Sequence, residues 1–266
     1  MERDCGNCNE IVKPQYDISI DNTIDLTAEL LLENSEKALH TKEIVIEVAG
    51  DSKFANLGRY VESVVFEKSF GNDSVEMAEA YKDYEKSSRF NICIDTESSR
   101  PIGAIRIIEN ADSGLKTLND ISDSPFNVDI DEFIKQRNID DLIKVWDVGT
   151  VAVLPEFQSS GASILLFRAM YTSALRNGID HIVSVIDEKP FKLLTKYFSV
   201  PFVPIIDGLE PLPYMGSNKS HAVYGYVPRF FDEMSKSNSR ISNKFSKIFN
   251  TLVMGDDDNL IVPLQK

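Results

Sequence analysis

The sequence contains three cysteines among its 266 residues, too few for a disulfide framework. Cys5 and Cys8 form one C-x-x-C pair, and Cys93 lies far away within an apolar run. A structural zinc site usually takes four ligands, often as two such pairs, and the second pair is missing. The cysteines are therefore expected to be reduced thiols, and no metal site is predicted.

Positive charge is also scarce. Lys and Arg total 28 against 42 for Asp and Glu, which gives a formal net charge of −14. The isoelectric point of about 4.7 argues against non-specific nucleic-acid binding, because such binding requires a surplus of cations. No run of about 18 apolar residues occurs, so no membrane-spanning helix is predicted. The first residues lack the apolar stretch of a secretory signal, and a cytoplasmic location is expected.

Apolar residues make up 42% of the chain, which is typical of a folded protein, and their periodicity predicts strands and helices in alternation. Strands are predicted over residues 43–48, 89–95, 101–108, 143–154, 180–186 and 222–227. Helices are predicted over 24–39, 52–70 and 189–198, with an almost wholly apolar one ending near 177. Residues 89–95 and 101–108 are predicted to form an antiparallel hairpin.

No linker interrupts residues 43–227, so this stretch is predicted to be one domain. Residues 1–42 form an N-terminal extension with one predicted helix. Residues 228–266 form a weakly helical C-terminal extension with an acidic tail. The connection 110–140 is expected to carry a single amphipathic piece around 130–134.

The most informative segment joins the strand 143–154 to the apolar helix through Pro155 and a run of small residues. Small residues let the backbone approach a ligand, and the first-turn amides of a helix lack intrahelical acceptors. These donors, at the positive end of the helix dipole, suit a pyrophosphate. An ordinary strand-to-helix turn is the alternative. The candidate donor-binding residues are Gln158, Ser159, Ser160, Gly161, Ala162 and Ser163.

In this order of elements, Gln158-Ser-Ser-Gly161-Ala-Ser163 resembles the [QR]-x-x-G-x-[GA] loop of the GNAT acyltransferase superfamily, which holds the pyrophosphate of coenzyme A. The resemblance implies an α/β (α+β) fold, with a mixed, mostly antiparallel central sheet that is flanked by helices and splayed at its fourth and fifth strands. It implies acyl-CoA as the donor. Gln158 replaces the commoner Arg and Ser163 stands where Gly or Ala is usual, which leaves an acyl carrier protein (acyl-ACP) as the other donor.

Residues 43–226 more narrowly resemble the acyl-homoserine lactone (autoinducer) synthases and the related long-chain N-acyl amino acid synthases. The matching pieces are Val65-Phe66, the strand Ile102–Ile108 with Arg106, Val145–Val148 with Trp146, and Val223-Tyr224-Gly225. This resemblance implies that Phe66, Arg106 and Trp146 bind substrate.

Three positions depart from the autoinducer synthases. Those enzymes carry Arg where this chain has Glu62 and Thr150, and Trp near Asn72. In that family these residues shape the site for S-adenosylmethionine. The departures favour another primary amine, such as an amino acid, as the acceptor.

Attack of an amine on a thioester needs a base, hydrogen-bond donors for the oxyanion, and both reactants held together. Asp147 is the first candidate for base or amine anchor, since burial beside Trp146 would raise its pKa. The alternative for Asp147 is a structural pair with Arg106, and Glu109 is the second candidate base. The superfamily often places a proton-donating Tyr after the fifth strand, which implies Tyr197. The candidate oxyanion donors are the amides of Val151, Ala152 and Val153.

Together these features predict an N-acyltransferase that moves an acyl group from acyl-CoA or acyl carrier protein to a primary amine by direct attack in a ternary complex. Docking an acidic carrier protein would need a basic patch, for which Arg168, Arg176, Lys192 and Lys196 are candidates. Two alternatives stay open. One is acyl-homoserine lactone synthesis from S-adenosylmethionine, and the other is a module that binds an acyl thioester without turnover.

Overall fold

The computed structural model describes residues 13–35, 41–158, 160–236 and 261–263. Within them the strands form one nine-stranded sheet in the order β6-β8-β5-β4-β3-β2-β1-β9, with β7 paired to β8 beside this path. Neighbouring strands are antiparallel except in the pairs β4–β5 and β1–β9. The strands are β1 Glu43–Ala49, β2 Ser88–Asp95, β3 Arg100–Glu109, β4 Val145–Val153, β5 His181–Asp187, β6 Val203–Pro204, β7 Leu212–Tyr214, β8 Ser217–Tyr226 and β9 Ile261–Pro263.

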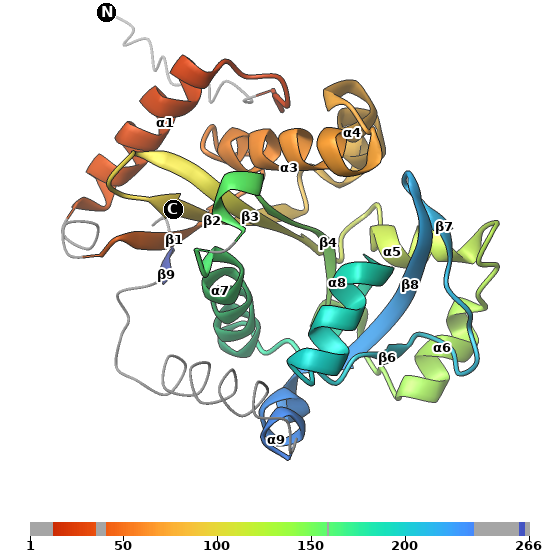
Figure 1. Ribbon diagram of the computed structural model, residues 1–266. Helices are drawn as coiled ribbons and strands as arrows, with labels where there is room; N and C mark the ends of the chain where they lie inside the picture. Colours follow the sequence, from red (N-terminus) through yellow and green to blue (C-terminus); the bar gives the residue numbers. More distant parts are fainter. Residues whose placement is uncertain (1–12, 36–40, 159, 237–260, 264–266) are drawn as a thin grey trace, which may run out of the picture.

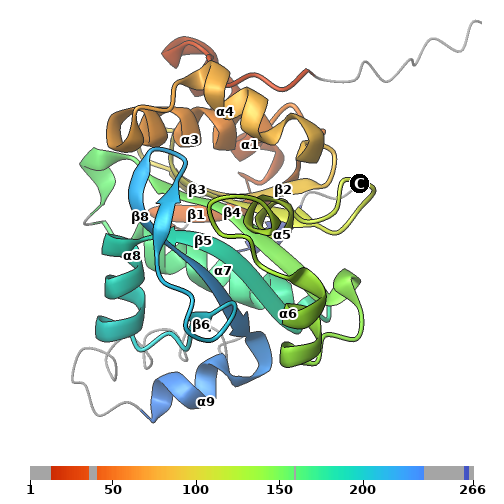
Figure 2. The ribbon, with the colours of Figure 1, turned by 90° about the vertical axis from the view of Figure 1, so that its right-hand side faces the viewer.

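Helices cover both faces of the sheet (Figures 1 and 2). On one face α3 packs against β3 and β4, with α1 and α4 beside it, and α7 lies against the other face. None of the described helices has the length and apolar character needed to cross a membrane. The helices are α1 Ile20–Glu33, α3 Ala55–Phe70, α4 Ser74–Tyr81, α5 Lys116–Ser122, α6 Ile130–Arg137, α7 Ala162–Arg176, α8 Glu188–Lys192 and α9 Phe230–Ser235.

Local sequence signals explain where the helices near the site begin and end. At the end of α3, Gly71 adopts a left-handed backbone conformation with φ of 80°. Asp73 and Glu76 then form a reciprocal capping box that starts α4. α7 begins directly after Gly161, whose φ of 102° suits a residue without a side chain.

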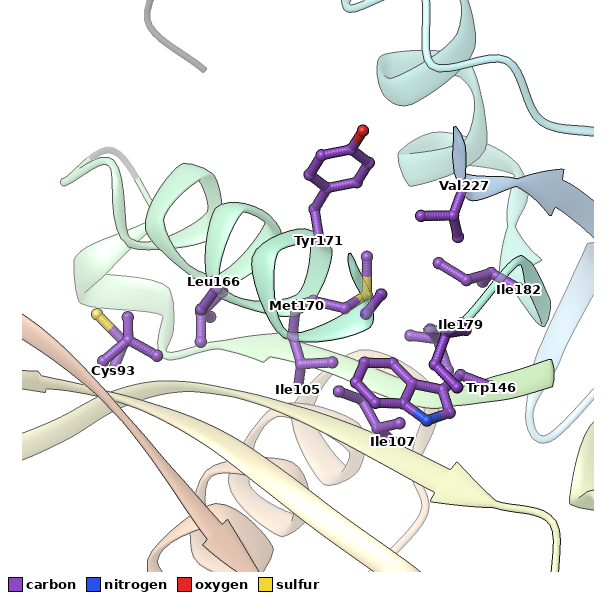
Figure 3. Packing of buried hydrophobic residues seen from close by; sticks show 14 of the residues in the cluster. Cys93, Ile105, Ile107, Trp146, Leu166, Met170, Tyr171, Ile179, Ile182 and Val227 are labelled. Carbon is purple, nitrogen blue, oxygen red and sulfur yellow. The ribbon is translucent and has the colours of Figure 1, made fainter. Parts of the chain in front are cut away.

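The apolar character of α7 is explained by its position against the sheet. Trp146 of β4 is 1% exposed, and Figure 3 shows its ring among Ile107, Met170 and Ile179. These residues belong to one core cluster that joins α7 to β3, β4 and β5. The indole therefore fills the core beneath α7 at the end where β4 and β5 are paired.

The predicted strands are all present, and the hairpin of β2 and β3 is confirmed. The connection 110–140 holds two helices, α5 and α6, where one amphipathic piece was expected. The first helix begins at Ile20, capped by Ser19, rather than near Ile24. The short strands β6 and β7 were not predicted, because pairs or triplets of residues carry no periodic signal.

The parallel strands β4 and β5 pair over three residues only, from Val145 opposite His181 to Asp147 opposite Val183. Beyond this point they separate, and the Ser184 hydroxyl donates to the Val148 carbonyl oxygen at 2.8 Å. A bulge follows in β4, because Arg106 of β3 pairs with Thr150 while the next residue pairs with Val148. The sheet is thus splayed at its fourth and fifth strands, as the sequence led us to expect.

Candidate active site

A cavity of about 260 Å³ lies between β4 and β5 where the two strands separate. Its walls come from the C-terminal half of α3, the first turns of α7, α8 and the segment after it, and the β7–β8 hairpin. Phe66, Phe167 and Phe202 are among the many apolar side chains that line it. Such a lining favours a hydrocarbon chain over a polar ligand.

The β7–β8 hairpin reaches α3 and encloses the cavity on that side. At Gly216, with φ of 78°, an added Cβ would lie 2.5 Å from the Phe70 carbonyl oxygen. Glycine therefore permits a contact between the two sides of the cavity that a larger residue would prevent.

Asp187 is the only carboxylate among the described residues that line the cavity. One of its oxygens caps α8 by accepting from the Lys189 amide at 3.0 Å, and the other accepts from the Ser217 hydroxyl at 2.7 Å. These bonds assign Asp187 a structural task at the junction of β5, α8 and β8.

The predicted donor loop lies at the end of the cavity where α7 begins. Ser163 and Ile164 of the first turn line the cavity. The Ala162 amide donates to the Ser160 hydroxyl at 3.1 Å, and the Ile164 amide to the Gly161 carbonyl at 2.9 Å. Gly161 has no atom within 4 Å of an added Cβ, so its neighbourhood leaves the backbone accessible. Gln158 and Ser160 are exposed, and Ser159 lies outside the described residues.

The backbone amides of β4 alternate in direction after the bulge. The Leu154 amide donates to the Ile102 carbonyl of β3 at 2.9 Å. Because amides alternate along an antiparallel pair, the Ala152 amide also points to β3, and Ala152 is buried. The amides of Val151 and Val153 point to the side from which β5 has separated. Val151 lines the cavity and is 38% exposed.

Beneath α3 lies a buried charge cluster, in which two arginines face two glutamates. Arg106 of β3 donates to Glu62 at 2.7 Å and to Glu85 at 3.2 Å. Arg59 donates to Glu85 at 2.5 Å. Burial opposes the charge of Arg106, but Glu62 raises its pKa well above the usual value. The cluster is therefore balanced in charge, and every guanidinium has a carboxylate partner.

This cluster connects the N-terminal segment to β4. Tyr16 donates its hydroxyl to Glu85 and accepts from Arg106, both at 2.5 Å. The Thr150 hydroxyl, which belongs to the bulged part of β4, donates to Glu62. Arg106, expected to bind substrate, is fully buried and occupied by these partners.

Asp147 is buried, but it lies outside the residues that line the cavity. Its two oxygens accept from the Thr117 amide at 2.5 Å and the Thr117 hydroxyl at 2.7 Å, so it caps the start of α5. Burial raises the pKa of Asp147 to about 6, although the bonds from Thr117 oppose this shift. Asp147 does not pair with Arg106, the alternative considered from the sequence, because Arg106 pairs with Glu62 and Glu85.

Glu109 lies at the end of β3, where it pairs with Arg89 at 2.8 Å and its side chain is 43% exposed. Trp146 belongs to the core rather than the cavity wall. Tyr197 ends the π-helical turn after α8, and its side chain lies outside the described part of the structure. Of the substrate-binding candidates, the structure thus places Phe66 at the cavity.

Sequence reasoning missed Tyr214 of β7, which lines the cavity beside Met215. Its hydroxyl donates to Asp120 of α5 at 2.5 Å and accepts from Lys116 at 3.2 Å. The three-residue strand that carries Tyr214 has no periodic signal, and nothing in the sequence indicates that residue 214 meets residues 116 and 120.

The basic patch considered for a carrier protein is incomplete, because Arg168 is 4% exposed. Lys192 pairs with Glu188 within the same turn.

Among the described residues no group of three or more His, Cys, Asp or Glu side chains lies close enough to hold a metal ion. Cys5 and Cys8 fall outside those residues.

No protein-family model and no curated protein matches the sequence. Among solved structures, the chain is similar to FeeM, an N-acyl amino acid synthase from uncultured soil microbes. The two are 19% identical with a TM-score of 0.52, over 73% of this chain and 95% of FeeM. It is also similar to BjaI, a CoA-dependent acyl-homoserine lactone synthase, at 10% identity and a TM-score of 0.47, over 84% of this chain and 94% of BjaI. The likeness to FeeM confirms the expected fold, a GNAT-like sheet flanked by helices.

Proposed function

We propose that this protein is an N-acyltransferase that moves an acyl group from an acyl thioester to a primary amine. The observation that carries the proposal is the apolar cavity between the separated strands β4 and β5, with the start of α7 at one end. The cavity supplies a place for an acyl chain, and the first turn of α7 supplies amide donors for a phosphorylated carrier.

The donor would lie with its diphosphate at Gly161 and Ser163 and its acyl chain in the cavity, since the Ala162 amide already donates to the Ser160 hydroxyl. Helix amides and the helix dipole stabilise the phosphate charge. Phe66 and Phe167 would contact the hydrocarbon, since both line the cavity. An apolar wall of this kind stabilises each buried methylene by about 0.8 kcal/mol.

The thioester carbonyl would lie beside β4, with the amides of Val151 and Val153 as oxyanion donors. Both point away from β3, and Val151 lies on the cavity wall. Two bonds hold the strand at the bulge: Tyr81 donates to the Gly149 carbonyl at 3.0 Å, and Thr150 donates to Glu62. Fixed donors of this type stabilise the charge that develops on the carbonyl oxygen as the amine attacks.

The similarity to an N-acyl amino acid synthase supports an amino acid as the acceptor. Synthesis of homoserine lactones is the weaker candidate, because Glu62 and Thr150 stand where the autoinducer synthases carry arginines. In this structure Thr150 donates its hydroxyl to Glu62 inside the charge cluster, so neither position carries a positive charge. Acyl-CoA and acyl carrier protein are both compatible with the donor loop.

The test is incubation of the purified protein with octanoyl-coenzyme A and a pool of amino acids, with thiol release and product mass as readouts. Thiol release that requires an amine, together with an N-octanoyl amino acid, supports the proposal. Binding of octanoyl-coenzyme A without release supports a non-catalytic module and refutes it. Formation of methylthioadenosine from S-adenosylmethionine identifies a lactone synthase instead. An octanoyl-loaded carrier protein, assayed in parallel, decides between the donors.

A further inference from the structure

A second group of ionisable side chains joins the cavity to solvent: Tyr214 of β7 with Lys116 and Asp120 of α5. Tyr214 lines the cavity, and its hydroxyl donates to an oxygen of Asp120 at 2.5 Å. Lys116 donates to the Tyr214 hydroxyl at 3.2 Å and also to Asp120. The phenol oxygen therefore donates one hydrogen bond and accepts one, which leaves it one lone pair that accepts from neither residue.

Exposure changes along this group. The Lys116 side chain is 7% exposed, whereas that of Asp120 is 28% exposed. Asp120 can therefore exchange protons with water, and Lys116 is held between Asp120 and two aromatic rings. Its Nζ lies 5.2 Å from the centre of the Tyr81 ring and 5.6 Å from that of Tyr214. The group thus begins at the cavity wall and ends at the protein surface.

The titratable groups that act on the Tyr214 hydroxyl come from three elements. Lys116 and Asp120 of α5 bond to it, and Tyr81 of α4 and Asp147 of β4 act on it through their charges. Burial, with smaller contributions from Tyr81 and Asp120, raises the pKa of Tyr214 well above its usual value. The phenol therefore keeps its proton at neutral pH. A protonated phenol between a donor and a carboxylate can pass on one proton as it receives another.

Asp147 and Asp187 are less suited to receive the proton of an acceptor amine. Asp147 lies off the cavity, and both its oxygens accept from Thr117. Asp187 reaches the cavity, but both its oxygens are engaged by the α8 cap and by Ser217. Asp147 is also 0% exposed and lacks the access to water that Asp120 has.

Resting on the proposed function, we infer that Tyr214 and Asp120 form the path by which the attacking amine loses its proton. The acceptor amine, which is protonated at pH 7, gives one proton to the Tyr214 oxygen as the Tyr214 proton moves to Asp120, and Asp120 releases that proton to water. The neutral nitrogen then bonds to the thioester carbon, the carbon–sulfur bond breaks, and the departing thiolate takes the second proton from the nitrogen through water. Lys116 holds the phenol and carboxylate in place and acts as a positioning residue.

The experiment measures kcat against pH with octanoyl-coenzyme A for the wild type, Tyr214→Phe and Asp120→Asn. Tyr84→Phe is a matched control, because the Tyr84 hydroxyl accepts from Asn119 of the same helix at 2.9 Å and Tyr84 does not line the cavity. With an amino acid acceptor at pH 7, Tyr214→Phe and Asp120→Asn should each lower kcat by about 10²-fold. The loss should shrink as the pH rises, because more of the amine arrives already neutral.

Hydroxylamine, which is neutral at pH 7, separates proton removal from structural damage. If the inference holds, Tyr214→Phe acylates hydroxylamine nearly as fast as the wild type does. Equal losses with both acceptors at every pH would indicate a structural role and overturn the inference. So would a Tyr214→Phe rate within about twofold of the wild type with amino acids. A wild type that releases no thiol with any amine overturns the proposed function itself.

Discussion

Glu62→Gln tests whether the charge cluster beneath α3 is balanced as described. The cluster holds Arg59 and Arg106 against Glu62 and Glu85, and both Arg106 and Glu62 are 0% exposed. Loss of the Glu62 charge leaves two guanidinium groups facing one carboxylate without access to water. Removing one partner of a buried pair costs about 3–5 kcal/mol. That is a large share of the roughly 5–15 kcal/mol by which a protein of ordinary stability resists unfolding.

Urea unfolding, followed by circular dichroism, measures this cost. With a slope of about 2 kcal/mol per molar urea, the midpoint should fall by about 2 M. Glu109→Gln is the matched control, because Glu109 also pairs with an arginine but its side chain is 43% exposed. Glu109→Gln should lower the free energy of unfolding by about 0–1 kcal/mol.

Replacing Glu62 and Arg106 together by methionine should recover most of the loss, since the Arg59–Glu85 pair is then balanced again. Equal unfolding midpoints for Glu62→Gln and Glu109→Gln would show that the charge of Glu62 is not needed to balance the buried arginines. A double variant less stable than Glu62→Gln would do the same.

Three further predictions concern the site. Burial raises the pKa of Asp147 to about 6, so the native state keeps this proton at pH values where the unfolded state, with a pKa of about 3.9, has lost it. Asp147 should therefore contribute about 3 kcal/mol of stability near pH 4 that is lost as the pH rises to about 6, and Asp147→Asn should remove this contribution from the pH dependence of unfolding. If Asp147→Asn also removed an inflection near pH 6 from the pH–rate profile, Asp147 would be the base after all. Gly161→Ala should raise the KM for octanoyl-coenzyme A about tenfold with little change in kcat, because a side chain is strained at φ of 102°. Ser184→Phe should fill the opening beside Val148 and lower kcat/KM for octanoyl-coenzyme A far more than for acetyl-coenzyme A, and an unchanged ratio would contradict the assignment of the acyl site.

The strands and the apolar helix were predictable because they are long enough to show their period. The sequence also indicated the splay, through the resemblance carried by the loop at residues 158–163. The bulge at Gly149 was not predictable, since it depends on the register between β3 and β4 rather than on either strand alone. The strands β6 and β7 were missed because they are too short to repeat a pattern.

Residue roles were harder to predict than the fold. Asp147 was expected to be a base or amine anchor, or else to pair with Arg106, which was expected to bind substrate; the observed partners of both residues come from distant segments. Thr117 reaches Asp147 across 30 positions, and Glu62 reaches Arg106 across 44. A single sequence carries no sign of such pairings. The same holds for Tyr214, whose bond to Asp120 spans 94 positions.

The hydroxyl of Tyr16 has a consequence for any attempt to shorten this protein. Tyr16 lies well ahead of the first strand, yet it contacts both Glu85 and Arg106 in the sealed interior. Trimming the chain to residue 43 would remove the phenol and leave Glu85 and Arg106 each without one of their hydrogen-bond partners. Cleavage upstream of β1 would thus disturb the hydrogen bonds that run from Arg106 through Glu62 to Thr150, so the leading segment affects the integrity of β4 at a distance.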